Sequence, residues 1–310
     1  MNDKATPRAD WFEVPVFIHG ITPEPKPESH APLFADFLRR VNAALTARGK
    51  PTLTEPGIMV EWGWEGSHGV DRDLAAAEDA LAQRIFRVFP PRRGLGNPLH
   101  RFADEIRRYF IYGFADLAYY TAAAGQKAIR ANVFDHLGEQ IDKLQAGAGK
   151  GQRPISLTFI THSAGTVIGH DFLYYLFETD GGLFGLGLEK ARKLVRKGAL
   201  RVRRLFTMGS PITPLVFRDD AAIRTIKNGG CLDGERIGLR TGDGFPNPRW
   251  VNIWDRDDIF SYPLAPLYCV PGDGDPLIVD VHFDLGPTFP KVHRAYWESV
   301  DVVNTLADAF

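Results

Sequence analysis

The chain has 310 residues, of which 44% are hydrophobic and 24% are charged. These values are typical of a globular protein with one large α/β domain or two smaller ones, and they exclude a disordered chain. The formal net charge of −1 provides no overall field that would favour nucleic acid as a partner.

The two cysteines, Cys231 and Cys269, are too few for a disulfide framework, and this number fits a reducing compartment. Residues 1–10 are polar and lack the apolar core of a signal peptide. No apolar run approaches the length of a membrane span, which is about 18 residues or more. We therefore expect a cytoplasmic protein without a membrane span.

Short apolar strands alternate with amphipathic helices in the first half of the chain. Strands are predicted at 14–20 and 57–62, and helices at 32–47, 74–88 and 129–144. The proline-rich segment 21–29 between the first strand and helix is a loop. The aromatic segment 99–124 is interpreted as a helix pair packed on the core, with a lipid-facing lid as the alternative.

The alternation continues in the second half of the chain. Strands are predicted at 156–160, 205–208, 250–254 and 277–281, with helices at 164–176 and from His293 onwards. The segment 226–248 is expected to be a long surface loop. Basic residues cluster between Lys190 and Arg204, which indicates either a solvated face or a site for an anionic lipid surface or acidic partner.

This order of elements predicts the α/β class, with a mostly parallel central sheet covered by helices on both faces. Residues 1–12 are expected to be an N-terminal extension and residues 13–310 a single domain. The segments 90–124 and 181–200 are candidates for a lid or cap near the site. Ligands of such sheets bind beyond the carboxyl ends of the strands.

The segment His162-Ser163-Ala164-Gly165 joins a predicted buried strand to a predicted helix. This arrangement is close to a nucleophile elbow, in which a sharp turn presents a serine hydroxyl. Thr161 replaces the first glycine of the usual G-x-S-x-G pattern. The alternative interpretation is an ordinary turn in which Ser163 caps the helix.

A serine hydroxyl needs a base, and the base needs an orienting acid. His293, after a loop and before a helix, is preferred as the base over His282 at the end of the last strand. Asp257 and Asp258 both follow the strand 250–254, and the choice between them stays open, with a slight preference for Asp258. Asp255 and Asp280 are the next candidates for the acid.

Two backbone N–H groups are candidates for an oxyanion hole, those of Ala164 and Ile21. Substrate-binding candidates at the same strand ends are His19, Gly20, Thr22 and His162. No cofactor and no metal site are expected.

The residues Ile160 to Gly165, preceded by a strand ending in His19-Gly20, resemble the α/β-hydrolase superfamily. The segments Trp250-Val251-Asn252-Ile253-Trp254 and His293-Arg294-Ala295-Tyr296-Trp297 resemble its lipase-like members, including the GPI inositol-deacylase-like and lecithin–cholesterol acyltransferase-like groups. Asp171 and Asp116-Leu117-Ala118-Tyr119-Tyr120 look like features of uncharacterised bacterial hydrolases of that kind. The order serine, aspartate, histidine is also the chain order of this superfamily.

The resemblance implies an α/β-hydrolase fold and a serine ester hydrolase with a Ser163–His293–Asp triad, acting on a small-molecule or lipid-like ester. An acyltransferase or thioesterase would use the same triad. A non-catalytic binding or scaffold protein could keep the same fold. Peripheral contact with a membrane is compatible with the sequence, and the sequence does not give the oligomeric state.

Overall fold

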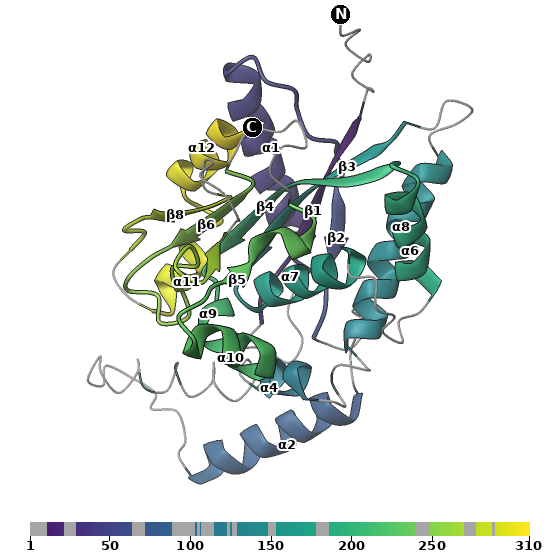
Figure 1. Cartoon of the computed structure of the whole chain (residues 1–310). Helices are drawn as coiled ribbons and strands as arrows, with labels where there is room; N and C mark the ends of the chain where they lie inside the picture. The colour runs from purple at the N-terminus through teal and green to yellow at the C-terminus, as the bar shows by residue number, and fades with distance from the viewer. Residues whose placement is uncertain are drawn as a thin grey trace, which may run out of the picture.

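A six-stranded sheet forms the centre of the fold, and every strand pair in it is parallel (Figure 1). Its order is β2-β1-β3-β4-β6-β8. The strands are β1 (Phe12–Ile18), β2 (Ile58–Val60), β3 (Ile155–His162), β4 (Leu200–Met208), β6 (Trp250–Trp254) and β8 (Ile278–His282). The predicted α/β class with a mostly parallel sheet is therefore confirmed.

The computed structural model describes most of the chain. The described residues are 11–21, 29–63, 72–88, 103, 106, 115–122, 125, 129–147, 153–177, 186–239, 248–269, 277–286 and 289–310. Of the predicted lid segments, this includes α4 (Ala115–Thr121) and α8 (Leu186–Arg196). Thr22 and most of residues 90–114 lie outside the described residues.

Helices cover both faces of the sheet because its strands are apolar on both sides. All eight residues of β3 are buried, with Phe159 in the core on one face and Ile160 in the core on the other. The first face packs against α6 (Ala131–Gly147), α7 (Ala164–Phe177) and α8. The second face packs against α1 (Ala31–Ala47) and α12 (Val300–Ala309). Such burial on both faces is characteristic of parallel sheets.

Smaller elements follow β4 and β6. These are α9 (Ile212–Leu215), η3 (Val216–Arg218), α10 (Asp220–Lys227), β5 (Leu232–Asp233), η4 (Gly234–Ile237) and β7 (Tyr268–Cys269), with β5 and β7 forming a separate parallel pair. In Figure 1, α4 and α10 lie near the lower end of the molecule, and α2 (Arg72–Val88) lies below them.

Three expectations need correction. The predicted C-terminal helix is two helices, α11 (Lys291–Ala295) and α12, because Ser299 leaves the helical path and its Oγ accepts a bond from the Val302 N–H. The predicted loop 226–248 contains β5 and η4, and Leu239 is buried. The basic segment is not simply a solvated face, because Arg192 and Arg204 are buried and donate to the carbonyls of Tyr175 and Pro248.

Cys231 is disulfide-bonded, next to the first residue of β5. Disulfides are rare in reducing compartments, so this bond does not support the expected cytoplasmic location. Among the described residues, no helix combines the length and apolar character needed to cross a membrane.

Candidate functional site

Ser163 lies on the sharp turn between β3 and α7 with a left-handed backbone, φ = 53°. This conformation is unfavourable for a residue with a side chain, so surrounding contacts must hold it. The Ser163 N–H donates to the Met208 carbonyl at the end of β4 (2.9 Å). The Ser163 carbonyl accepts from the Thr166 N–H (2.9 Å) and hydroxyl (2.6 Å). The turn is therefore fixed from both sides, as a nucleophile elbow requires.

Two glycines let the end of β1 approach this turn. A Cβ atom on Gly20 would lie 2.4 Å from the Ser163 Cβ and 2.9 Å from its Oγ. A Cβ atom on Gly165 would lie 2.3 Å from the His19 carbonyl oxygen. Both positions therefore exclude any larger residue, and the His19-Gly20 backbone lies directly against Ser163.

Thr161, in place of the usual elbow glycine, is accommodated by a glycine on the helix. A Cβ atom on Gly169 of α7 would lie 2.9 Å from the Thr161 Cγ2. The Thr161 hydroxyl donates to the Phe206 carbonyl (2.9 Å), so its polar atom is satisfied within the core. In the usual motif a glycine on the strand leaves this space; here Gly169 on α7 leaves it for Thr161.

Gly169→Ala should therefore destabilise the protein. Overpacking costs about 1–3 kcal/mol, and the higher helix propensity of alanine offsets up to about 1 kcal/mol of that cost. Thr161→Ser removes Cγ2 but keeps the hydroxyl. In that background, Gly169→Ala should be neutral or stabilising. Urea unfolding of the four proteins of this double-mutant cycle measures the coupling. An equal cost of Gly169→Ala in both backgrounds would contradict the proposed compensation.

His293 and Asp258 form a buried hydrogen-bonded pair, with 2.8 Å between the His293 Nδ1 and the Asp258 Oδ2. The same Oδ2 accepts the Tyr296 hydroxyl (2.9 Å), and Oδ1 accepts the Phe260 N–H (3.1 Å). Burial opposes the charged carboxylate, but His293 and these two donors outweigh it and lower the pKa of Asp258. Asp258 is therefore an ionised partner that orients the imidazole.

The other candidates for acid and base lie elsewhere. Asp257 is exposed, next to Asp258 in the chain, and is not the aspartate that contacts His293. Asp255 accepts the N–H groups of Asp257 and Leu285, and so holds two loops together. Asp280 accepts the Asn252 side chain and the N–H groups of Leu264 and Ala265. His282 is exposed, and its ring centre lies 4.7 Å from that of Trp254 with the two planes tilted by 58°.

The Asp258–His293 pair lies next to the end of β4, the strand whose last carbonyl, that of Met208, accepts the Ser163 N–H. Gly209 directly follows Met208, whose carbonyl accepts the Ser163 N–H. A Cβ atom on Gly209 would lie 3.0 Å from the Asp258 Oδ2 and 3.3 Å from the His293 Cε1. The structure thus brings Ser163, His293 and Asp258 to neighbouring positions at the carboxyl edge of the sheet.

No family model and no curated protein matches this chain. The site is therefore interpreted from its own geometry.

His162 and His19 are packing residues rather than exposed substrate ligands. The His162 Nε2–H donates to the His293 carbonyl (2.6 Å), and the two rings are 4.7 Å apart. Burial and the neighbouring His293 lower the pKa of His162 to about 3, so this ring stays neutral at ordinary pH. His162, the residue before Ser163, thereby holds the backbone of His293 in place.

His19 orients the peptide that carries the Ile21 N–H. The Trp62 N–H donates to the His19 Nε2 (3.0 Å), so Nδ1 carries the proton and donates to the Gly20 carbonyl. Burial, followed by the nearby His30, lowers the pKa of His19 well below its usual range. In a trans peptide the N–H is opposite the carbonyl, so the Ile21 N–H is directed away from His19.

Tyr296 contacts the Asp258 carboxylate, although the sequence indicated it only as part of the segment His293–Trp297 and gave it no role of its own. It lies three residues after His293, which is the spacing that puts two side chains on one helix face. Its ring is fully buried, and burial together with Asp258 raises its pKa, so the hydroxyl stays a donor. That spacing from the histidine is the signal that could have identified it.

Tyr296→Phe should move the acid limb of the kcat/KM profile to higher pH. Without the hydroxyl, the Asp258 carboxylate becomes a stronger acceptor for the protonated imidazole and so favours the inactive form of the base. The loss of one hydrogen bond of about 0.5–1.5 kcal/mol corresponds to about half to one pH unit. Tyr174→Phe, at a half-buried tyrosine of α7 whose hydroxyl accepts from Arg236, is the control and should leave the profile unchanged. An unchanged limb in Tyr296→Phe would contradict this role.

Within the described ranges, no group of three or more histidine, cysteine or acidic side chains is arranged to hold a metal ion. Thr22, one of the predicted substrate-binding residues, lies outside those ranges.

Proposed function

We propose that this chain is a serine hydrolase with an α/β-hydrolase fold that cleaves a carboxylic ester by way of an acyl-enzyme. The observation that carries the proposal is the buried Asp258–His293 pair beside a serine held at φ = 53°. An ordinary helix-capping serine needs neither a left-handed backbone nor a histidine–carboxylate pair at the neighbouring strand end. The parallel sheet order and the position of the turn after β3 also support this fold.

In this proposal, Ser163 attacks the acyl carbonyl while the Nε2 of His293 takes the hydroxyl proton. The alcohol leaves with that proton, and water then attacks the acyl-enzyme with His293 as base again. Asp258 accepts the Nδ1–H, holds the imidazole in the tautomer that leaves Nε2 as the base, and stabilises the imidazolium. Tyr296 and the Phe260 N–H position the carboxylate from its other lone pairs.

The oxyanion would be bound by the backbone N–H groups of Ala164 and Ile21. Ala164 is the first residue of α7, and N–H groups of a first helical turn have no acceptor within the helix. Ile21 follows the Gly20 carbonyl that His19 holds, so its peptide plane is oriented before substrate binds. Preorganised donors of this kind stabilise the transition state because they do not have to reorient during the reaction.

An apolar acyl or alcohol group fits the surface next to the acid. Ile259 and Tyr262 follow Asp258 in the chain and are 46% and 37% exposed. Exposed apolar side chains beside a polar site are typical of a surface that binds an apolar ligand. We therefore propose a lipid-like or other apolar ester as the substrate class.

A fluorophosphonate probe tests the proposal directly. The serine oxygen of an activated triad displaces fluoride and becomes phosphonylated, so the wild-type protein should be labelled on the peptide that contains Ser163. Ser163→Ala should not be labelled, whereas Ser156→Ala, at a buried serine near the start of β3, should be labelled normally. Absence of labelling in a folded wild-type protein would favour a non-catalytic scaffold.

A further inference from the structure

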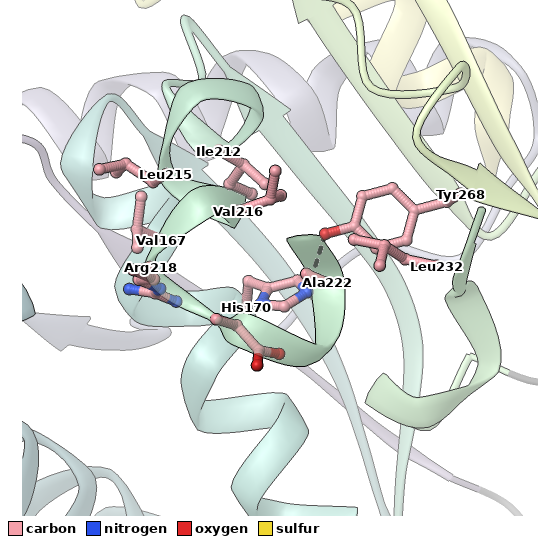
Figure 2. A pocket seen from close by; sticks show the side chains of 10 residues that line it. Val167, His170, Ile212, Leu215, Val216, Arg218, Ala222, Leu232 and Tyr268 are labelled. Atoms are coloured by element: carbon pink, nitrogen blue, oxygen red, sulfur yellow. Dashed lines mark hydrogen bonds between the residues drawn. The ribbon is translucent and has the colours of Figure 1, made fainter. Parts of the chain in front are cut away.

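A pocket lies on the side of α7 that faces α9 and α10 (Figure 2). Its volume is about 90 Å³, and it is formed by elements that follow β3 and β4. Figure 2 shows aliphatic side chains on one side of it, including Val167, Ile212 and Leu215, and Arg218 and His170 on the other. None of its lining residues belongs to the Ser163–His293–Asp258 group, so it is a separate recess.

The polar side of the pocket is a network around the buried Asp171. One oxygen of Asp171 accepts from Arg130 (2.9 Å) and Tyr120 (2.9 Å), and the other accepts from Arg218. Burial opposes its charge, but Arg218, His170 and Arg130 lower the pKa of Asp171, so it is ionised. Two guanidinium groups therefore share one carboxylate.

Arg218 has hydrogen-bonding capacity left toward the pocket. A guanidinium has five N–H donors, and within the described chain Arg218 contacts only the Asp171 carboxylate as an acceptor. Its side chain is 24% exposed, while those of Arg130 and Asp171 are 6% exposed. Arg218 is thus the most accessible of these three charged side chains.

The other polar residues of the pocket are already engaged. The Tyr268 hydroxyl bonds to the His170 Nε2 (3.2 Å), as drawn in Figure 2. The Asp219 carboxylate also lines the pocket, but it caps α10 by accepting the Ala221 N–H (2.8 Å). The positive end of the α10 dipole offsets part of the charge of Asp219, and Arg218 is the arginine in the pocket lining.

We propose that this pocket binds a short-chain monocarboxylate, with the carboxylate on Arg218 and the alkyl group against Val167, Ile212 and Leu215. Guanidinium and carboxylate are both planar and pair through two parallel hydrogen bonds. The pocket volume of about 90 Å³ is small, which favours a ligand with a short alkyl group. A dianion such as phosphate is less suitable because Asp171 and Asp219 are close by. The site goes beyond the proposed ester hydrolysis and does not depend on it.

Titration of the full chain with sodium butyrate, followed by saturation-transfer NMR and calorimetry, tests the proposal. We expect saturable binding with a Kd on the order of 1 mM, as for a tiny ligand with one charged contact. Arg218→Gln should weaken binding at least about tenfold, equivalent to one charge-assisted hydrogen bond. Ala222→Leu, which fills the recess and leaves the arginines in place, should weaken it similarly. Butyramide, the uncharged isostere, should not bind measurably.

Arg224→Gln is the matched control, because it removes an exposed arginine of α10 outside the pocket lining. Binding in this variant should equal that of the wild type. The proposal is overturned if butyrate does not saturate, if butyramide binds equally well, or if Ala222→Leu binds butyrate like the wild type. An equal loss in Arg224→Gln also overturns it, since that indicates general charge attraction. Because Ala222→Leu keeps the Asp171 network, failure of Arg218→Gln to fold leaves the test valid, and no outcome depends on ester hydrolysis.

Discussion

Ser163→Ala should reduce kcat for a p-nitrophenyl ester by on the order of 10⁴-fold or more. The hydroxyl is the proposed nucleophile, and no other group at the turn can form the acyl-enzyme. His293→Ala should be nearly as damaging, and the double variant no worse than the single ones, because a nucleophile and its base act as one unit. Steady-state and burst kinetics on esters of graded chain length measure these losses and also reveal the preferred acyl length.

His282→Ala is the matched control for the base, because this histidine is exposed and contacts Trp254, whereas Asp258 pairs with His293. Its kcat should remain close to that of the wild type. Circular dichroism and thermal unfolding should show that Ser163→Ala is folded, because alanine keeps the backbone N–H and carbonyl hydrogen bonds that hold the turn. Substantial turnover by folded Ser163→Ala would contradict the assignment of Ser163 as the nucleophile. A large loss of kcat in His282→Ala with a small loss in His293→Ala would identify His282 as the base.

Asp258→Asn should lower kcat by on the order of 10⁴-fold, the size of the effect that the same substitution has on the triad aspartate of a serine protease. Asparagine keeps the shape of the side chain but can present an NH₂ group to Nδ1, which favours the wrong imidazole tautomer. It also removes the charge that stabilises the imidazolium. Measurement on one short-chain ester at several pH values separates this loss from a simple change in protonation.

Asp257→Asn provides an internal comparison at the adjacent residue. Its carboxylate is solvent-exposed, so its replacement should change kcat by less than about threefold, in line with the small energies of exposed charges. Two mild variants would show that another group orients His293. A severe effect of Asp257→Asn with a mild effect of Asp258→Asn would mean that the loop after β6 has a different conformation in the active protein.

The alternation of apolar strands and amphipathic helices was sufficient to predict the parallel sheet. The central strands β3 and β6 are almost entirely buried, so their composition is distinctive over a few residues. The break between α11 and α12 was not predictable from periodicity, because Tyr296 and Val300 continue the apolar spacing across it. The break depends on the cap that Ser299 makes with Val302, which competes locally with a continuous helix.

The site was predictable to the extent that it depends on strand ends. Ser163, His293 and the Asp257-Asp258 segment follow buried strands or precede a helix, and parallel strands end at a common edge. The choice between the two aspartates needs the direction of each side chain, which the burial of Asp258 and the exposure of Asp257 provide. The orienting role of His19 depends on Trp62, which is distant in sequence, and so had no local signal.

The pairing of Thr161 with Gly169 has a consequence for how such turns are recognised in other chains. A pattern written along the chain requires the glycine two positions before the serine, and it would pass over this protein. The steric requirement concerns a gap between a strand and the helix that crosses it, and either partner can leave that gap. A search that accepts a glycine either two residues before or six residues after the serine would therefore describe the spatial condition, and it should retrieve elbow sequences that linear motifs miss.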